Sequence, residues 1–159
     1  MPVMQENNLL PINFKMQLSR SPNIEYRVQS VSIPGIELGS VQVPTHFGTP
    51  IRSPGNITYS PLNVNFIVSE TLSDYMEILG WMTSLGHPSD LEQYPKDPFQ
   101  RKCDIGITLL TSGSRPSMTF VFTNAYPISL GGIDFDVTNT DTQPVIVGVT
   151  FDYDRINIQ

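Results

Sequence analysis

The chain has 159 residues, and its 15 acidic and 9 basic side chains give a formal net charge of −6. This length fits one domain, 1–159, and an acidic surface disfavours tight binding to the phosphates of nucleic acids. A single cysteine, Cys103, excludes an internal disulfide. No apolar stretch approaches the ~20 residues that cross a bilayer, and the N-terminus lacks a secretory signal pattern. We therefore expect a protein made in a reducing cytoplasm, away from membranes.

The first predicted strand covers residues 12–18, and a second lies near 26–33. In the first, Ile12, Phe14, Met16 and Leu18 alternate with the polar residues Asn13, Lys15 and Gln17. Alternate side chains of a pleated strand point to opposite faces, so this strand has one apolar and one polar face.

An extended arm is predicted at residues 36–60. Proline and glycine interrupt regular structure here, yet large apolar residues are frequent: Ile36, Leu38, Val41, Val43, Phe47, Ile51, Ile57 and Tyr59. Disordered linkers are poor in such residues, so the arm is expected to be ordered. Two interpretations stay open at this point, a loop folded over its own core and an arm that reaches a neighbouring subunit.

Alternation returns at residues 62–68 and leads directly into one amphipathic helix, 72–85, with Thr71 as a candidate N-cap. At about 100° per residue, one arc of this helix is apolar and is expected to cover the sheet: Leu72, Tyr75, Met76, Ile78, Leu79 and Met82. Asp74, Glu77 and Trp81 fall outside this arc, so Trp81 is predicted to point away from the sheet. Either the loop at 87–99 covers Trp81, or Trp81 anchors a partner protein.

Later strands are predicted at 105–109, 118–122 and 145–153, with a short one at 133–137. Strands with one apolar and one polar face are typical of antiparallel sheets. We therefore predict a mainly β chain, folded as an antiparallel β-sandwich or barrel with one flanking α-helix.

Motifs that carry chemistry are missing from the sequence. The two histidines, His46 and His87, lack zinc-site spacing to each other and to Cys103. The paired carboxylates are better explained as solvated groups on strand faces: Asp134 with Asp136, and Asp152 with Asp154. Because no nucleophile elbow, phosphate loop or dinucleotide motif is present, we expect no catalytic activity, no metal and no cofactor.

The order of these elements resembles the tail tube proteins of contractile-tailed (T4-like) bacteriophages, and also the tube domain of the baseplate protein that initiates the tube. The resemblance spans about residues 12–155 and rests on element order and strand patterning. It is carried by the Ile33-Pro34-Gly35 turn before the arm, the strand that runs into the helix at Tyr75–Met82, the segment Cys103–Ile107 with its hairpin to Phe120, and the last strand.

This resemblance implies a virion protein that forms hexameric rings, which stack into the tube through which DNA leaves the capsid. The implied partners are further copies of the chain, the tail sheath protein, and a baseplate or terminator protein, with DNA only as passing cargo and assembly in the host cytoplasm. Residues 36–60 would contact the adjacent ring, and the helix with Asp74, Glu77 and Trp81 would lie toward the sheath. A polar strand face would line the channel, with candidates Asn13, Lys15, Gln17, Asn63, Asn65, Thr150 and Asp152.

Three alternatives remain at the level of sequence. The chain could form a baseplate initiator ring or a tail-terminal ring in place of the repeating tube subunit. A carbohydrate-binding β-sandwich would show a row of exposed aromatic rings. A small barrel hydrolase would need convergent titratable groups, which the sequence does not offer.

Overall fold

The computed structural model describes residues 9–46, 48, 50–87, 95–97, 101–138 and 143–159. Every strand pairing within these ranges is antiparallel, which confirms the predicted fold class. In chain order the elements are β1 (Phe14–Leu18), α1 (Pro22–Glu25), β2 (Val28–Ser32), β3 (Ile36–Val43), β4 (Ile51–Tyr59), β5 (Leu62–Ile67), α2 (Ser73–Gly86), β6 (Cys103–Leu110), β7 (Pro116–Leu130), β8 (Ile146–Asp152) and β9 (Arg155–Ile158).

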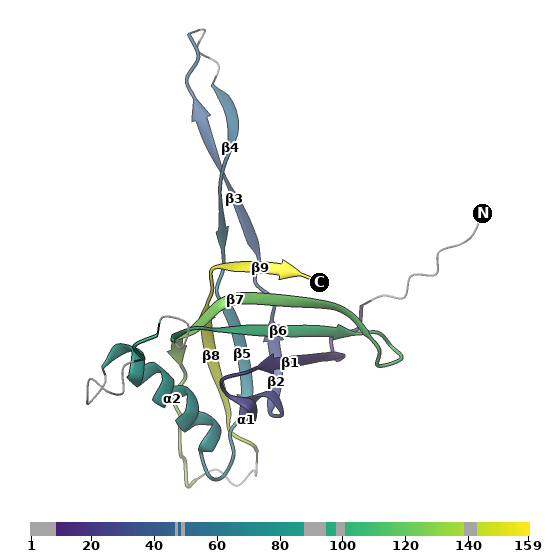
Figure 1. Ribbon diagram of the computed structural model, residues 1–159, viewed down its shortest axis with the longest axis vertical. Coiled ribbons are helices and arrows are strands. Elements are labelled where there is room, and N and C mark those ends of the chain that lie inside the picture. The colour runs from purple at the N-terminus through teal and green to yellow at the C-terminus, as the bar shows by residue number, and fades with distance from the viewer. Residues whose placement is uncertain (1–8, 47, 49, 88–94, 98–100, 139–142) are drawn as a thin grey trace, which may run out of the picture.

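Two crossed layers of strands form the body of the molecule (Figure 1). The strand order is β1-β6-β7-β8-β5-β2, with β9 paired to β7. The first half of β7 pairs with β6 and β9, and its second half pairs with β8. Between these halves Asn124 takes a left-handed conformation (φ 56°), which asparagine tolerates better than most residues. The long strand β7 therefore passes from one layer to the other.

The hydrophobic core fills the space between the layers. One layer contributes Met16, Leu18, Ile105, Ile107 and Phe122, and the other contributes Leu62, Val64, Phe66, Val147, Val149 and Phe151. All of these residues come from the apolar positions of predicted alternating strands, because burial on one face requires that pattern. Ile12 is exposed, since β1 begins only at Phe14.

Helix α2 closes one side of the sandwich, but its orientation differs from the predicted one. The helix buries Asp74, Ile78 and Trp81, whereas Met76 and Leu79 are exposed. Asp74 can be buried because its Oδ2 accepts a hydrogen bond from the Ser69 backbone N–H at 3.0 Å and lies 3.7 Å from Arg27 Nε. The sequence prediction places Asp74 on the solvent side of the helix because aspartate is polar. Since Asp74 is buried, the buried face of α2 is rotated relative to the predicted one.

Several short features were also not anticipated. The helix begins after Leu72, which has a left-handed conformation (φ 56°), and Thr71 does not cap it. Residues 133–137 form no strand, while α1 and β9 are too short to show a periodic pattern. No helix in the described part of the chain is both long enough and apolar enough to span a membrane.

Candidate assembly surfaces

Strands β3 and β4 pair only with each other and form a hairpin that projects from the sandwich (Figure 1). Six large apolar side chains on it are 46–62% exposed: Ile36, Leu38, Val41, Val43, Ile51 and Ile57. Tyr59 is partly buried at the base, and Phe47 lies outside the described residues. An isolated two-stranded hairpin is marginally stable in water, and a large exposed apolar surface marks an interaction site. The hairpin is therefore the leading candidate for an assembly surface.

Contacts with the core hold the base of this hairpin in place. The Tyr153 hydroxyl donates a hydrogen bond to the Ser60 carbonyl at 2.7 Å, and the Tyr59 and Tyr153 ring centroids are 5.9 Å apart. The Tyr153 ring also meets Phe122 edge to face at 4.9 Å. Burial raises the pKa of Tyr153, so its hydroxyl stays a hydrogen-bond donor at neutral pH. Sequence alternation placed Tyr153 on an apolar face but gave no signal for this role.

A bulge in the middle of the hairpin divides its apolar residues into two sets. Leu38 pairs with Ile57, but Ser40 pairs with Pro54, so β4 contains one extra residue. A Cβ at Gly55 would lie only 3.1 Å from the Gly39 backbone, and this close approach favours glycine. Beyond the bulge, Val41 and Val43 lie on the face opposite to Ile36 and Leu38, because β3 itself continues its regular alternation.

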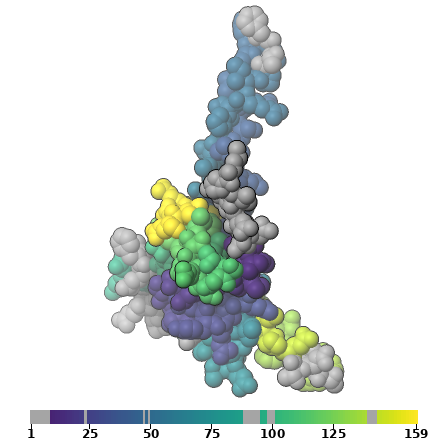
Figure 2. Space-filling view, turned by 90° about the vertical axis from the view of Figure 1, so that its right-hand side faces the viewer, coloured from purple at the N-terminus to yellow at the C-terminus, as the bar shows by residue number. Residues whose placement is uncertain are grey.

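An open groove of about 540 Å³ lies at the opposite end of the molecule. One side is the turn after β5, with Val68, Ser69, Glu70 and Leu72, and the other is formed by Ile133, Phe135, Gln143, Pro144 and Val145. Residues 131–138 and 143–146 extend from the lower end of the body, beside the turn after β5 (Figure 2). Phe135 is 82% exposed, so an aromatic ring beside this groove remains uncovered in the single chain.

The predicted outward residues of α2 are not on its outer surface. Trp81 is 2% exposed, its Nε1–H donates to the Arg101 carbonyl at 3.0 Å, and its ring lies 6.2 Å from Phe151. Asp74 is buried and Glu77 is partly buried. Trp81 is therefore a core residue, so the prediction that it points away from the sheet and could anchor a partner is wrong. Tyr94 and Phe99, which were expected to cover it, lie outside the described residues.

The outer surface of α2 consists of other residues. Met76, Leu79, Gly80, Thr83 and Ser84 line a shallow surface depression there, and the Met76 side chain is 57% exposed. This exposed stripe is the part of α2 that a partner can reach.

The predicted channel residues fall on two different outer surfaces. Asn13, Lys15 and Gln17 belong to the β1–β6 layer, whereas Asn63, Asn65 and Thr150 belong to the β2–β5–β8 layer. Because the core lies between the layers, these polar faces point away from each other. At most one set can therefore line a single channel, so the two sets of candidates are alternatives.

The polar face of the β2–β5–β8 layer carries a network of uncharged side chains and, at the end of β8, the carboxylate of Asp152. Thr150 Oγ1 donates to Asn63 Oδ1 at 2.9 Å, and Asn65 Nδ2 donates to Ser30 Oγ at 3.0 Å. Asp152, at the end of β8, accepts a hydrogen bond from the Tyr126 hydroxyl at 3.0 Å, which raises the pKa of Tyr126.

Charged residues lie close together near Asn124, where β7 passes from one layer to the other. Asn124 Nδ2 donates to Asp154 at 2.8 Å and Lys102 Nζ lies 3.2 Å from the same carboxylate, so both hold the pKa of Asp154 below its usual value. Within the described ranges no three histidine, cysteine, aspartate or glutamate residues form a metal-binding group. Burial raises the pKa of the Cys103 thiol to about 12.

Comparisons with known proteins agree with this architecture. The sequence profile of the phage tail tube protein family matches residues 3–159. Among solved structures, the chain is similar to the sheath/tube terminator of the PVC extracellular contractile injection system (TM-score 0.68, 21% identity, 98% of this chain and 99% of that one). It is also similar to the tube-terminating cap of the anti-feeding prophage (TM-score 0.72, 18% identity, 100% and 99%).

A third similar structure is a chain of the six-fold symmetrised baseplate of the anti-feeding prophage (TM-score 0.66, 16% identity, 98% of this chain and 97% of that one). A search of curated proteins returned no match. The solved structures share the fold, and the family profile covers nearly the whole sequence. The chain belongs to the phage tail tube protein family and is a structural component of the tail particle.

Proposed function

We propose that this protein forms six-membered rings that stack into the tube of a contractile tail. The observation that carries the proposal is the β3–β4 hairpin, which exposes apolar side chains at a distance from the core and is fixed at its base by Tyr153. Within the described part of the chain, the two strands of this hairpin pair with no other strand. The six-fold symmetry of a baseplate that contains this fold supports the ring.

Two further surfaces receive roles in this arrangement. The hydrogen-bonded polar face of β2, β5 and β8 lines the channel, because a surface that carries Asp152 but none of the strands' lysine or arginine side chains makes no strong contacts with the phosphates of passing DNA. The exposed stripe of α2 at Met76 and Leu79 faces the sheath, in place of the buried Trp81.

A terminal ring is the second candidate, and a specific observation favours it. The chain covers 99% of both the PVC terminator and the anti-feeding prophage cap. The number of copies per particle separates the two roles, because a terminal ring contributes one ring and a tube subunit contributes many.

Electron microscopy and analytical ultracentrifugation of the purified full chain test the proposal. We expect rings that stack at high protein concentration. A variant in which two glycines replace residues 36–59, between Gly35 and Ser60, should give isolated rings, with thermal unfolding to show that the sandwich still folds. A full chain that stays monomeric at every concentration contradicts the proposed function.

A further inference from the structure

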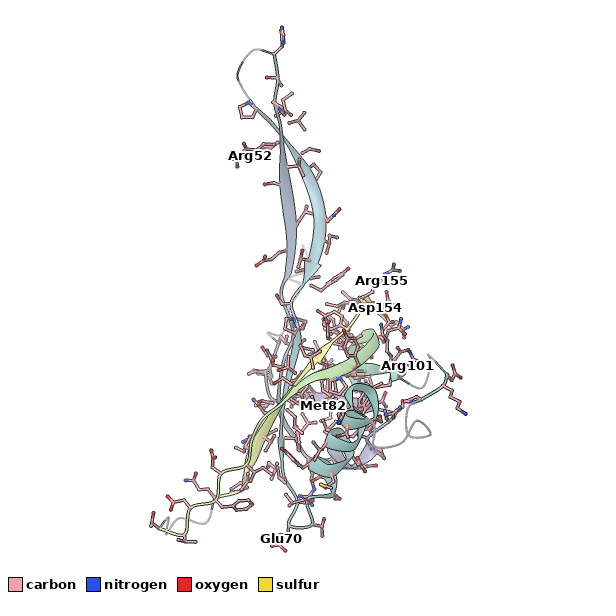
Figure 3. All side chains as sticks on the ribbon, turned by 90° about the vertical axis from the view of Figure 1, so that its left-hand side faces the viewer. Arg52, Glu70, Met82, Arg101, Asp154 and Arg155 are labelled. Atoms are coloured by element: carbon pink, nitrogen blue, oxygen red, sulfur yellow. The ribbon has the colours of Figure 1, made fainter. Side chains whose placement is uncertain are left out.

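The hairpin and the groove lie at opposite ends of the molecule. Figure 3 shows Arg52 on the far part of the hairpin and Glu70, which lines the groove, at the other end. When identical subunits stack head to tail along this axis, the hairpin of one copy approaches the groove of the next. A heterologous contact of this kind propagates into a filament.

The far half of the hairpin has two chemically different faces. Val43 pairs with Ile51 and Val41 pairs with Ser53, so the three apolar side chains share one face. Gln42 pairs with Arg52 on the other face. The hairpin thus carries an apolar surface on one side and a cation on the other.

The groove has two sides that match these faces. Ile133, Phe135, Pro144 and Val145 make one side mainly apolar. The turn on the other side carries the exposed carboxylate of Glu70 and the hydroxyl of Ser69, beside Val68 and Leu72. A thin two-stranded ribbon between these sides would bury apolar groups against apolar groups. The same orientation would bring a guanidinium to a carboxylate, the pair that forms the strongest side-chain hydrogen bonds.

We propose that the groove binds the far half of the β3–β4 hairpin of a second copy in the adjacent ring. Val41, Val43 and Ile51 pack against the apolar side, and Arg52 pairs with Glu70. This inference rests on the proposed stacking of rings and assigns the receiving site. The extra residue in β4 at the bulge, near Gly39 and Gly55, brings Ile51 opposite Val43. The apolar side chains of the half that enters the groove therefore share one face.

Charge reversal tests the pairing. Arg52→Glu and Glu70→Arg are each expected to lower the proportion of rings found in stacks by about tenfold, because like charges then meet in the interface. The double variant is expected to restore stacking. Arg115→Glu, which makes the same charge change on the exposed β6–β7 turn, is the matched control and should stack like the natural chain. Single variants that stack normally, or a double variant no better than either single one, overturn the assignment.

Cysteine cross-linking gives a readout that does not depend on charge. In a Cys103→Ala background, Ile51→Cys combined with Phe135→Cys should give a ladder of covalent multimers on oxidation, and neither substitution alone should extend beyond a dimer. Rings that stack without any ladder contradict the inference but leave the proposed function standing. A natural chain that forms no rings contradicts the proposed function instead.

Discussion

Tyr153 connects the exposed hairpin with the core. Its ring packs against Phe122 inside the sandwich, while its hydroxyl holds the Ser60 carbonyl at the end of β4. A side chain that is 6% exposed thereby fixes the base of a ribbon in which every residue of β3 is exposed. Because β3 alone rises about 27 Å at ~3.4 Å per residue, a small change at the base displaces the tip substantially.

Tyr153→Phe tests this role. The variant keeps the ring contacts but removes one hydrogen bond, so we expect a loss of about 1 kcal/mol in the free energy of unfolding. Denaturant unfolding measures that loss. Hydrogen exchange should speed up in residues 51–59 and remain unchanged in β5. If the hairpin exchanges as in the natural chain, then Tyr153 stabilises only the core.

At the level of elements, the alternating strands of the core followed from the sequence, whereas the helix orientation did not. Burial on one face imposes a period of two on a strand, and Leu62, Val64 and Phe66 show it directly. In α2, the burial of Asp74 depends on Ser69 and Arg27, whose positions only the folded chain defines. Similarly, the groove joins segments near residues 70 and 135, and no local pattern indicates their proximity.

Paired substitutions in α2 distinguish its observed orientation from the predicted one. Leu79→Asp on the exposed stripe, where the leucine is 39% exposed, should lower the free energy of unfolding by about 1 kcal/mol or less. Trp81→Ala should lower it by about 3–5 kcal/mol, because it empties a packed site and leaves the Arg101 carbonyl without its donor. Urea unfolding of both variants provides the measurement. A larger loss of stability from Leu79→Asp would support the orientation predicted from the sequence, in which Leu79 packs against the sheet.

At the scale of the whole molecule, the sandwich has two polar outer faces, and a ring can direct only one of them inward. The β2–β5–β8 face is uncharged where Asn63, Asn65 and Thr150 meet, whereas Lys15 brings a cation to the β1–β6 face. A channel that passes DNA without retaining it favours the first face, since each cation near a phosphate strengthens binding. The net charge of −6 also weakens binding of DNA to the protein surface.

Thiol labelling of assembled tubes identifies the inner face. Asn65→Cys and Gln17→Cys each place one exposed cysteine on opposite faces, and the natural Cys103 contributes little background, because a thiol with a pKa raised to about 12 is mostly protonated at neutral pH. In tubes, both variants should react with a small maleimide. A maleimide on a long polymer should label Gln17→Cys but not Asn65→Cys, because the channel excludes the polymer. Isolated subunits should label equally at both positions, which controls for local accessibility. The reverse pattern in tubes would place the β1–β6 face inside, and the cation of Lys15 would then line the path of the DNA.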